Sequence, residues 1–443
     1  MKKINQILDL KQVHKTYLIL ALTVGTIFSL FMPLFNEPDG QYHLAVSGRI
    51  VNRIVDASRY DEVAITTGMD GQESSYKSGT HFEKYYLNKA VFIESKDLPR
   101  NIYYQYTNFV YWGHVVPAIG LFIGSLIYPS IGVMVTVGRL LSVLVYSLCT
   151  FFIIKKVERA KLLFTVVFLS PVVMNSFASL SYDAAGYVSV AYIMMNVINM
   201  IVNPQKNVPL KSIVFSTILT ILSSKSNYWL LLLMYPVAFL YTENKYAQLC
   251  RKKLSLWIDW LKQKKRWLVL LLLVLLLIVS TFTVITVRYG GLLVVIRRFI
   301  MTIIFSYGKT MGINSWLVEP YPQFNFIPTW VSAAWILLVS FILLSDTKYV
   351  TSKFITWSSI FLFFFGIFGV YFVMLGYRSM SSSYIEGIQG RYFTPTLLLL
   401  SLFISGIKMR LNIERRWLLA WTYLLVIFSN SILVFNTVIN LMR

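Results

Sequence analysis

The stretch Y-L-I-L-A-L-T-V-G-T-I-F-S-L-F-M-P-L-F, Tyr17 to Phe35, decides the fold, and N-E-P-D-G-Q-Y-H follows it from Asn36 to His43. The first piece carries no charge and is long enough to cross a bilayer core of roughly 30 Å as a helix. Its charged flank lacks a small-residue cleavage site, so it is interpreted as a retained anchor. Carboxylates where such a helix meets water usually face a cavity or a partner. The sequence therefore predicts a membrane anchor with a candidate site at its end.

The rest of the chain repeats this apolar pattern. Of 443 residues, 56% are hydrophobic and 14% are charged, which is too apolar for an ordinary soluble fold. We expect a single all-α integral membrane domain over residues 1–443 with about eleven transmembrane helices. The predicted spans are Tyr17–Phe35, Val133–Ile154, Leu162–Leu180, Ala184–Val202, Ser212–Ser224, Tyr228–Tyr241, Trp267–Val287, Phe326–Leu344, Phe354–Leu375, Tyr392–Ile407 and Trp417–Leu441.

The net charge of +22 does not indicate nucleic acid, because the basic residues fall between apolar runs rather than on one face. They are interpreted as topology signals and contacts for anionic lipid, so the bilayer is an expected partner. Cys149 and Cys250 lie in unrelated surroundings and predict neither a disulfide framework nor a zinc site.

The run Tyr111–Tyr128 is apolar enough to span but is interrupted by Gly113, Pro117 and Gly120. If it does not cross, six short segments on the N-terminal side hold 24 of the 41 Lys and Arg residues. The positive-inside rule then places the N-terminus in the cytoplasm of a multi-pass cell-membrane protein. We therefore interpret the run as a surface-lying or re-entrant helix.

This topology makes residues 36–128 a long first extracytoplasmic loop with juxtamembrane helices. An amphipathic piece, Leu44–Ile54, predicts a helix in the membrane plane, and Thr67–Gly79 predicts a flexible connection. The topology also brings Asp39, Asp183, Lys225, Arg378, Glu386 and Arg391 to the outer face. A single external cavity is the simplest explanation.

Three acids are candidate catalytic residues. Asp39 and Glu37 are concentrated where the anchor ends, and a partly desolvated carboxylate there suits a general base. The alternative for Asp39 is a solvated turn residue beside Pro38 and Gly40. Asp183, in S-L-S-Y-D-A-A-G, is a second carboxylate for the same cavity, or else a helix N-cap for Ala184 onward.

Basic residues supply the candidate substrate contacts. Arg391 lies in Y-I-E-G-I-Q-G-R-Y-F-T-P, from Tyr384 to Pro395, with Glu386, Gln389 and Tyr392 beside it. An arginine there can hold a phosphate by a forked pair of hydrogen bonds, or can extend towards lipid headgroups. Lys225 interrupts two short apolar runs and is a second phosphate candidate. Arg378 belongs to the same outer face.

No cofactor is expected, and a divalent metal ion is the alternative. Asp39 and His43 are four residues apart and would share a helical face, with Glu37 near them. His43 is otherwise a substrate contact. The identity of any metal stays open.

Three motifs together resemble the DUF2142 family of bacterial polytopic membrane proteins and, more remotely, the GT-C superfamily of lipid-linked-sugar glycosyltransferases. They are P-D-G-Q-Y-H at Pro38–His43, S-Y-D-A-A at Ser181–Ala185 and G-I-Q-G-R-Y-F-T-P at Gly387–Pro395. The GT-C resemblance implies that Asp39 is the base and that Arg391 contacts the phosphate of a polyprenyl-phosphate sugar. Gly40 departs from the family, which usually has Glu there.

We therefore expect a membrane glycosyltransferase that moves a sugar from a polyprenyl-phosphate carrier to a cell-surface glycan or lipid-linked acceptor. The alternatives are a transporter or flippase of lipid-linked oligosaccharide, and an inactive scaffold in envelope polysaccharide assembly. Intramembrane charge and broken helices suit a transporter equally well, whereas the absence of a clear internal repeat counts against it. Gly40 favours the scaffold.

Overall fold

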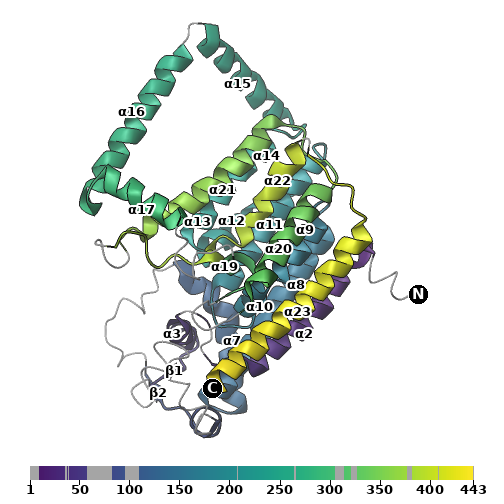
Figure 1. Cartoon of the computed structure of the whole chain (residues 1–443), viewed down its shortest axis with the longest axis vertical. Coiled ribbons are helices and arrows are strands. Elements are labelled where there is room, and N and C mark those ends of the chain that lie inside the picture. The colour runs from purple at the N-terminus through teal and green to yellow at the C-terminus, as the bar shows by residue number, and fades with distance from the viewer. Residues whose placement is uncertain are drawn as a thin grey trace.

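A computed structural model gives the architecture, which is a bundle of helices with a small ribbon at one end (Figure 1). It describes residues 9–34, 37, 39–56, 82–94, 109–206, 208–263, 266–304, 314–320, 327–376, 382–407 and 409–442. The longer helices are α2 (Val13–Phe31), α3 (Gly40–Ile50), α7 (Val115–Ile127), α8 (Ile131–Lys156), α11 (Asp183–Val202), α12 (Leu210–Ser223), α15 (Lys245–Gln263), α16 (Arg266–Thr286), α17 (Leu292–Ile304), α20 (Thr329–Ser345), α21 (Lys353–Met374) and α23 (Arg415–Met442).

Six helical segments of the described chain are long and apolar enough to cross a membrane: Leu10–Phe31, Ile131–Lys156, Asp183–Val202, Trp267–Tyr289, Lys353–Met374 and Arg415–Ile439. Each coincides with a predicted span, so the multi-pass all-α interpretation is confirmed. Four further apolar helical segments are shorter, namely Tyr111–Ile127, Leu210–Ser223, Thr329–Ser345 and Pro395–Gly406. The figure of eleven spans therefore stays a prediction.

One expected span, Leu162–Leu180, is wrong as a continuous helix. It divides into α9 (Lys161–Phe168) and α10 (Pro171–Phe177). Ser170 is extended, with φ −63° and ψ 148°, because the proline ring that follows disfavours the helical conformation. Both pieces are buried, which provides protein partners for the interrupted backbone.

The predicted span Tyr228–Tyr241 is likewise composite. It consists of α13 (Ser226–Trp229), the 3₁₀ turn η7 (Leu230–Leu233) and α14 (Met234–Phe239). The predicted span Tyr392–Ile407 is composite as well. It comprises the 3₁₀ turn η10 (Pro395–Leu398) and α22 (Leu399–Gly406), and the 3₁₀ turn η9 (Gly390–Tyr392) precedes them.

The run Tyr111–Tyr128, which glycines and a proline interrupt, is helical. Its 3₁₀ turn η6 (Phe109–His114) leads into α7, which packs along α8. A Cβ at Gly120 would lie 2.7 Å from the Cα of Gly138, and one at Gly124 would lie 2.7 Å from the Cα of Met134. Small residues thus permit close backbone contact between these two helices, as in membrane helix pairs generally. With 13 residues, α7 is about 20 Å long and too short to span alone.

The long loop contains more structure than expected. Helix α3 begins at Gly40 rather than at Leu44, and β1 (Ile54–Val55) pairs antiparallel with β2 (Phe92–Ile93). A short π-helix, η3 (Glu83–Leu87), precedes β2. Residues 67–79, the predicted flexible connection, lie outside the described residues.

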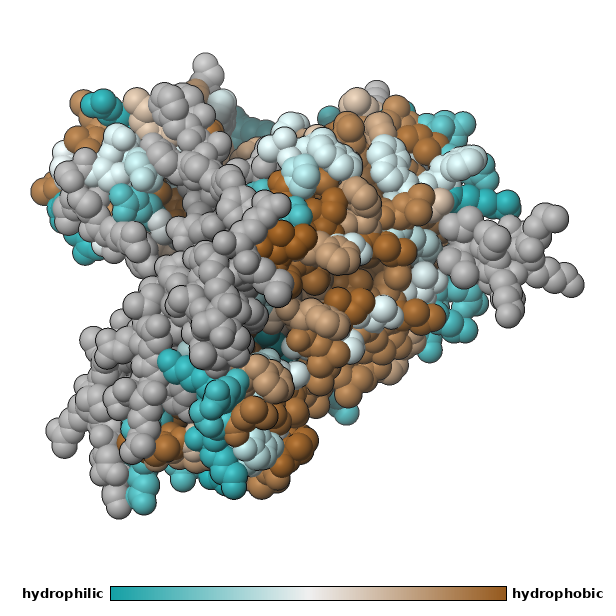
Figure 2. Space-filling model, turned by 60° about the horizontal axis from the view of Figure 1, so that its bottom comes forward, coloured by the Kyte–Doolittle hydropathy of each residue, from teal (hydrophilic) through white to brown (hydrophobic). Residues whose placement is uncertain are grey.

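Helix α11 is the centre of the core. Seventeen of its twenty side chains are buried, and its neighbours include α8, α12 and α14. The flanks of the bundle are apolar, as the brown surface in Figure 2 shows, which is the surface that a bilayer solvates. Because α11 begins at Asp183, the most buried of the long apolar helices carries one of the candidate acids.

Helices α15 and α16 project from the bundle, and α17 returns the chain to it (Figure 1). Large apolar side chains of α16 are exposed on all its sides, for example Leu272 at 59%, Leu273 at 59% and Leu277 at 67%. Lys252 and Lys253, which belong to the basic residues interpreted above as topology signals, lie in helix α15.

Candidate functional site

Asp183 lies at the first position of α11 and is 2% exposed. Its backbone N–H donates to Oγ of Ser181 (3.2 Å), and the backbone N–H of Ser181 in turn donates to Oγ of Ser179 (3.0 Å). The residue in the N-cap position is Tyr182, and the Asp183 side chain pairs with two cations instead. The positive end of the helix dipole adds to the stabilisation of this carboxylate.

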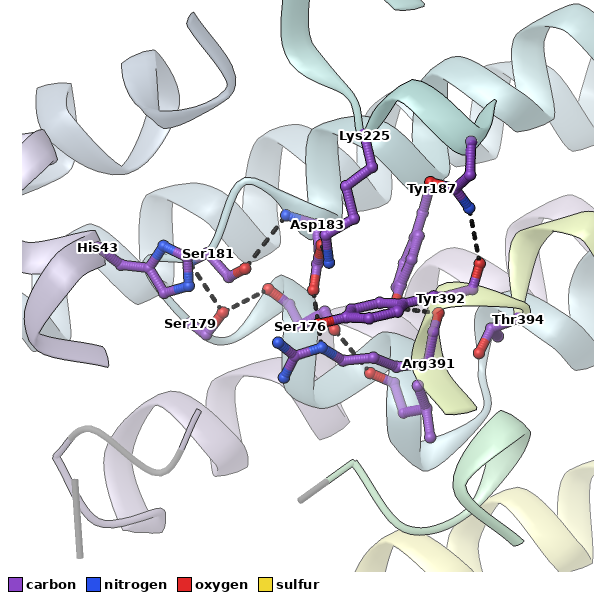
Figure 3. A network of polar contacts seen from close by, with 12 residues as sticks. His43, Ser176, Ser179, Ser181, Asp183, Tyr187, Lys225, Arg391, Tyr392 and Thr394 are labelled. Atoms are coloured by element: carbon purple, nitrogen blue, oxygen red, sulfur yellow. Dashed lines mark hydrogen bonds and ion pairs between the residues drawn. The ribbon is translucent and has the colours of Figure 1, made fainter. Parts of the chain in front are cut away.

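Lys225 and Arg391 are those two cations (Figure 3). The Nζ of Lys225 is 2.6 Å from Oδ1 of Asp183, and the Nε of Arg391 is 3.0 Å from Oδ2. Lys225 precedes α13 after the polar break in S-S-K-S-N-Y-W, and Arg391 lies in η9. Three candidates that are far apart in the chain are thus in direct contact, and we call them the charged triad.

Backbone contacts hold the arginine segment in place. The Tyr187 hydroxyl donates to the carbonyl of Arg391 (3.0 Å), and the Asn227 amide donates to the carbonyl of Tyr392 (3.4 Å). Thr394 donates to the carbonyl of Trp316. Gly390 leaves no space for a side chain, because a Cβ there would lie 2.0 Å from Oγ of Ser315. The glycine next to Arg391 therefore allows close packing.

Aromatic rings surround the lysine. Its Nζ lies 3.8 Å from the ring centroid of Tyr392 and 5.2 Å from that of Tyr182. Burial lowers the pKa of Lys225 to about 8, and the adjacent Asp183 limits that decrease. The ammonium is therefore still mostly charged at pH 7, and the charged triad carries one net positive charge.

A buried histidine pair adjoins the triad. Nδ1 of His43, on α3, lies 2.9 Å from Nε2 of His114, and both rings pack against Tyr182. Burial lowers the pKa of His43 well below its usual range, and His114 adds to this effect. His43 thus reaches the neighbourhood of the triad as a neutral group.

Asp39 is exposed and immediately precedes α3. Its backbone has φ 61° and ψ 28°, a left-handed conformation that Asp tolerates better than most residues and that often marks functional positions. Its charge interacts with both Lys225 and Arg391. A solvated carboxylate therefore lies near the two buried cations.

Glu37 occupies a different environment. Its Oε2 pairs with Arg139 (3.2 Å), and its Oε1 accepts from the backbone N–H of Leu180 (3.3 Å). Arg139 also donates to the carbonyls of Met32 (3.0 Å) and Pro33 (2.9 Å). Glu37 thus links the segment after α2 to α8 and to the loop before α11.

Sequence reasoning missed Arg139, His114 and Tyr187. The signal for Arg139 was present, because a lone arginine inside an apolar span requires partners. His114 and Tyr187 carried no such signal, since only the packing of α7, α3 and α11 gives them their contacts.

The remaining candidates are distributed as follows. Glu386 is half-buried and interacts electrostatically with Arg298 of α17, a buried residue that donates to the carbonyls of Leu375 and Tyr384. Gln389 occupies the N-cap position of η9 without a side-chain capping bond, and the ring of Tyr392 lies against Lys225. Arg378 lies outside the described residues.

The proposed metal ligands Glu37, Asp39 and His43 do not form a cluster, because Glu37 is paired with Arg139 and His43 with His114. Over the described ranges, no three His, Cys, Asp or Glu side chains gather in a way that could hold a metal ion.

The arrangement has three chemical capacities. Lys225 and Arg391 share the single carboxylate of Asp183, so they can also bind an anionic group. Figure 3 shows the terminal nitrogens of Arg391 pointing away from Asp183, which leaves them directed towards such a ligand. The exposed Asp39 can accept a proton. The neutral His43 and the tyrosine rings can contact a polar, uncharged ligand.

The fold and these motifs together define a multi-pass membrane protein with a buried charged site at a helix end. Residues 22–400 match the family model DUF2142, described as a predicted membrane protein, and the chain belongs to that family. The resemblance of the three motifs to the DUF2142 family is thereby confirmed. No curated protein and no solved structure matches the chain.

Proposed function

We propose that this protein is a cell-membrane glycosyltransferase that moves a sugar from a polyprenyl-phosphate carrier to a cell-surface glycan or lipid-linked acceptor, with its N-terminus in the cytoplasm. The observation that carries the proposal is the charged triad with an exposed carboxylate beside it. The remote likeness of the motifs to GT-C enzymes supports the same reaction class.

In this proposal Lys225 and Arg391 bind the phosphate of the donor and stabilise the negative charge that grows on it as the sugar leaves. Fixed cations in a water-poor site are effective for this purpose because they need little reorganisation. Arginine adds a forked geometry that matches phosphate oxygens.

Asp39 is the proposed general base, which removes the proton of the acceptor hydroxyl as that oxygen attacks the anomeric carbon. Asp183 is a poor candidate for that step, because two cations stabilise its charged form. Its role is to position Lys225 and Arg391. Glu37 is assigned a structural role, since both of its oxygens have partners.

The test is transfer of radiolabelled sugar from polyprenyl-phosphate donors to membrane acceptors by the purified protein. We expect transfer by the wild type and a loss of about 10² to 10⁴-fold in Asp39→Asn, the usual contribution of a general base. Glu414→Gln, a change at an exposed acid on another segment, is the control and should transfer sugar like the wild type.

Two outcomes contradict the proposal. If labelled carrier crosses a liposome bilayer without forming a new linkage, the protein is a transporter or flippase. If neither transfer nor crossing occurs with any donor while the protein is folded, the scaffold alternative is favoured.

A further inference from the structure

A polar cavity lies at the opposite end of α11 from the charged triad. It has a volume of about 740 Å³ and is lined by the ends of α8, α11 and α12 together with the segment between the last two. Asp183 begins α11 and Val202 ends it, so a helix of 20 residues, about 30 Å, separates the two sites. The cavity is therefore at the other membrane face and is independent of the proposed transfer site.

Three lysines from separate segments line the cavity: Lys156 at the end of α8, Lys206 between α11 and α12, and Lys211 at the start of α12. The acid in the lining is Glu158, whose carboxylate accepts from the amide of Asn203. Three positive charges and one negative charge leave a net charge of +2. The cavity thus favours an anion.

The wall of the cavity is a row of asparagines on one face of α11. Asn196, Asn199 and Asn203 are three and four residues apart, which places them one above another along the helix. Asn199 joins the lysine segment to the wall, because its amide donates to the carbonyl of Lys156 (3.1 Å) and its Oδ1 accepts from the N–H of Glu158 (3.0 Å). These contacts fix the backbone around the cavity.

Helix α12 contributes an apolar side chain to the cavity and continues as an exposed apolar surface beside it. Phe215 lines it and is 57% exposed. Leu210, Val214 and Ile218, each four residues from the next, are 73%, 47% and 51% exposed on the same helix. An apolar stripe thus runs from the lysines along a membrane-facing helix, and it suits a ligand with an anionic head and an apolar tail.

We propose that this cavity binds the phosphate headgroup of an anionic membrane lipid, with the acyl chains lying along the exposed stripe of α12. Lysine ammonium groups bind phosphate as mobile point charges, and clusters of them at a membrane face attract anionic lipid. The position at the ends of three helices supports a lipid rather than a soluble ligand.

The experiment is a native mass-spectrometry titration of the full-length protein in detergent with phosphatidylglycerol, phosphatidylcholine and glycerol 3-phosphate. We compare the wild type with Lys206→Ser/Lys211→Ser and with Lys252→Ser/Lys253→Ser, a control with the same charge change on exposed positions of α15. Removing two lysines is expected to weaken phosphatidylglycerol binding about 30-fold, whereas the control remains like the wild type.

Equal binding of phosphatidylcholine, or an equal loss in both double variants, overturns the proposal, because binding then reflects hydrophobicity or total charge. Glycerol 3-phosphate that binds as tightly as the lipid overturns the lipid assignment. The variant Lys206→Arg/Lys211→Arg retains the charges and should retain binding, which separates charge loss from misfolding. None of these readouts depends on glycosyl transfer.

Discussion

Two buried ionic sites lie within the same bundle and differ in how their charges are balanced. In the first, Glu37 and Arg139 neutralise each other, and backbone carbonyls of Met32 and Pro33 take the other hydrogen bonds of the arginine. In the second, Asp183 faces two cations, Lys225 and Arg391. A balanced pair joins chain segments, whereas a site with surplus positive charge can receive an anion.

The comparison predicts that breaking the balanced pair reduces stability most. Arg139→Met leaves Glu37 buried without its partner, and such a change usually lowers the free energy of unfolding by about 3 to 5 kcal/mol. The measurement is the thermal unfolding midpoint in detergent. Arg139→Met with Glu37→Gln should recover part of the loss, because the unpaired charge is gone. A stable Arg139→Met that has lost transfer would instead place this pair in the functional site.

For the unbalanced site the expected effect is on activity. Arg391→Gln removes a charged phosphate donor and should reduce sugar transfer about 10² to 10³-fold, as removal of a fixed stabilising donor does in other enzymes. Arg391→Lys retains the charge without the fork and should give an intermediate rate. If transfer by Arg391→Gln equals that of the wild type, the triad does not bind the donor phosphate.

A steric change tests whether the site depends on the packing beneath it. A Cβ at Gly113 would lie 2.6 Å from Cβ of Tyr182 and 3.0 Å from the carbonyl oxygen of Ser223. Gly113→Ala should therefore displace the residue before Asp183, lower stability by about 1 to 3 kcal/mol and reduce transfer. Gly366→Ala is the matched control, since a Cβ there meets nothing within 4 Å. Equal behaviour of the two variants would contradict this dependence.

The smallest expected effect is on the pH dependence of the free energy of unfolding. His43 is neutral in the folded protein because burial, with His114 beside it, lowers its pKa. The nearby cations Lys225 and Arg391 oppose its protonation and Asp183 favours it. In the unfolded chain His43 takes up a proton near pH 6.5, so falling pH favours unfolding.

At pH 5.5 this single residue should lower the free energy of unfolding by up to about 1.4 kcal/mol relative to pH 7.5. His43→Gln should therefore lose part of the decrease in thermal midpoint between these pH values. A decrease identical to that of the wild type would show that His43 is protonated in the folded state.

Much of the fold could be predicted because the length of an apolar run, which shows whether it can span a membrane as a helix, is visible in the sequence of that run alone. The runs that became α2, α8, α11, α16, α21 and α23 were located within a few residues. The failures have local causes that the apolar pattern hides. Pro171 divides Leu162–Leu180, and the strands β1 and β2 pair across a long stretch of the loop.

The candidate site was predictable in part. Asp183, Lys225 and Arg391 each interrupt or border an apolar run, so each was conspicuous alone. The sequence did not separate Glu37 from Asp39, two residues apart, because their difference arises from Arg139 on another helix.

The sequence by itself determined that this chain spans a membrane many times and which charges lie at the ends of its helices. It does so because the cost of placing charges and open backbone in hydrocarbon limits where they can be. Only the tertiary structure decided which charges meet. Asp183 pairs with two cations and Glu37 with one, because pairing depends on contacts between segments that are distant in the chain.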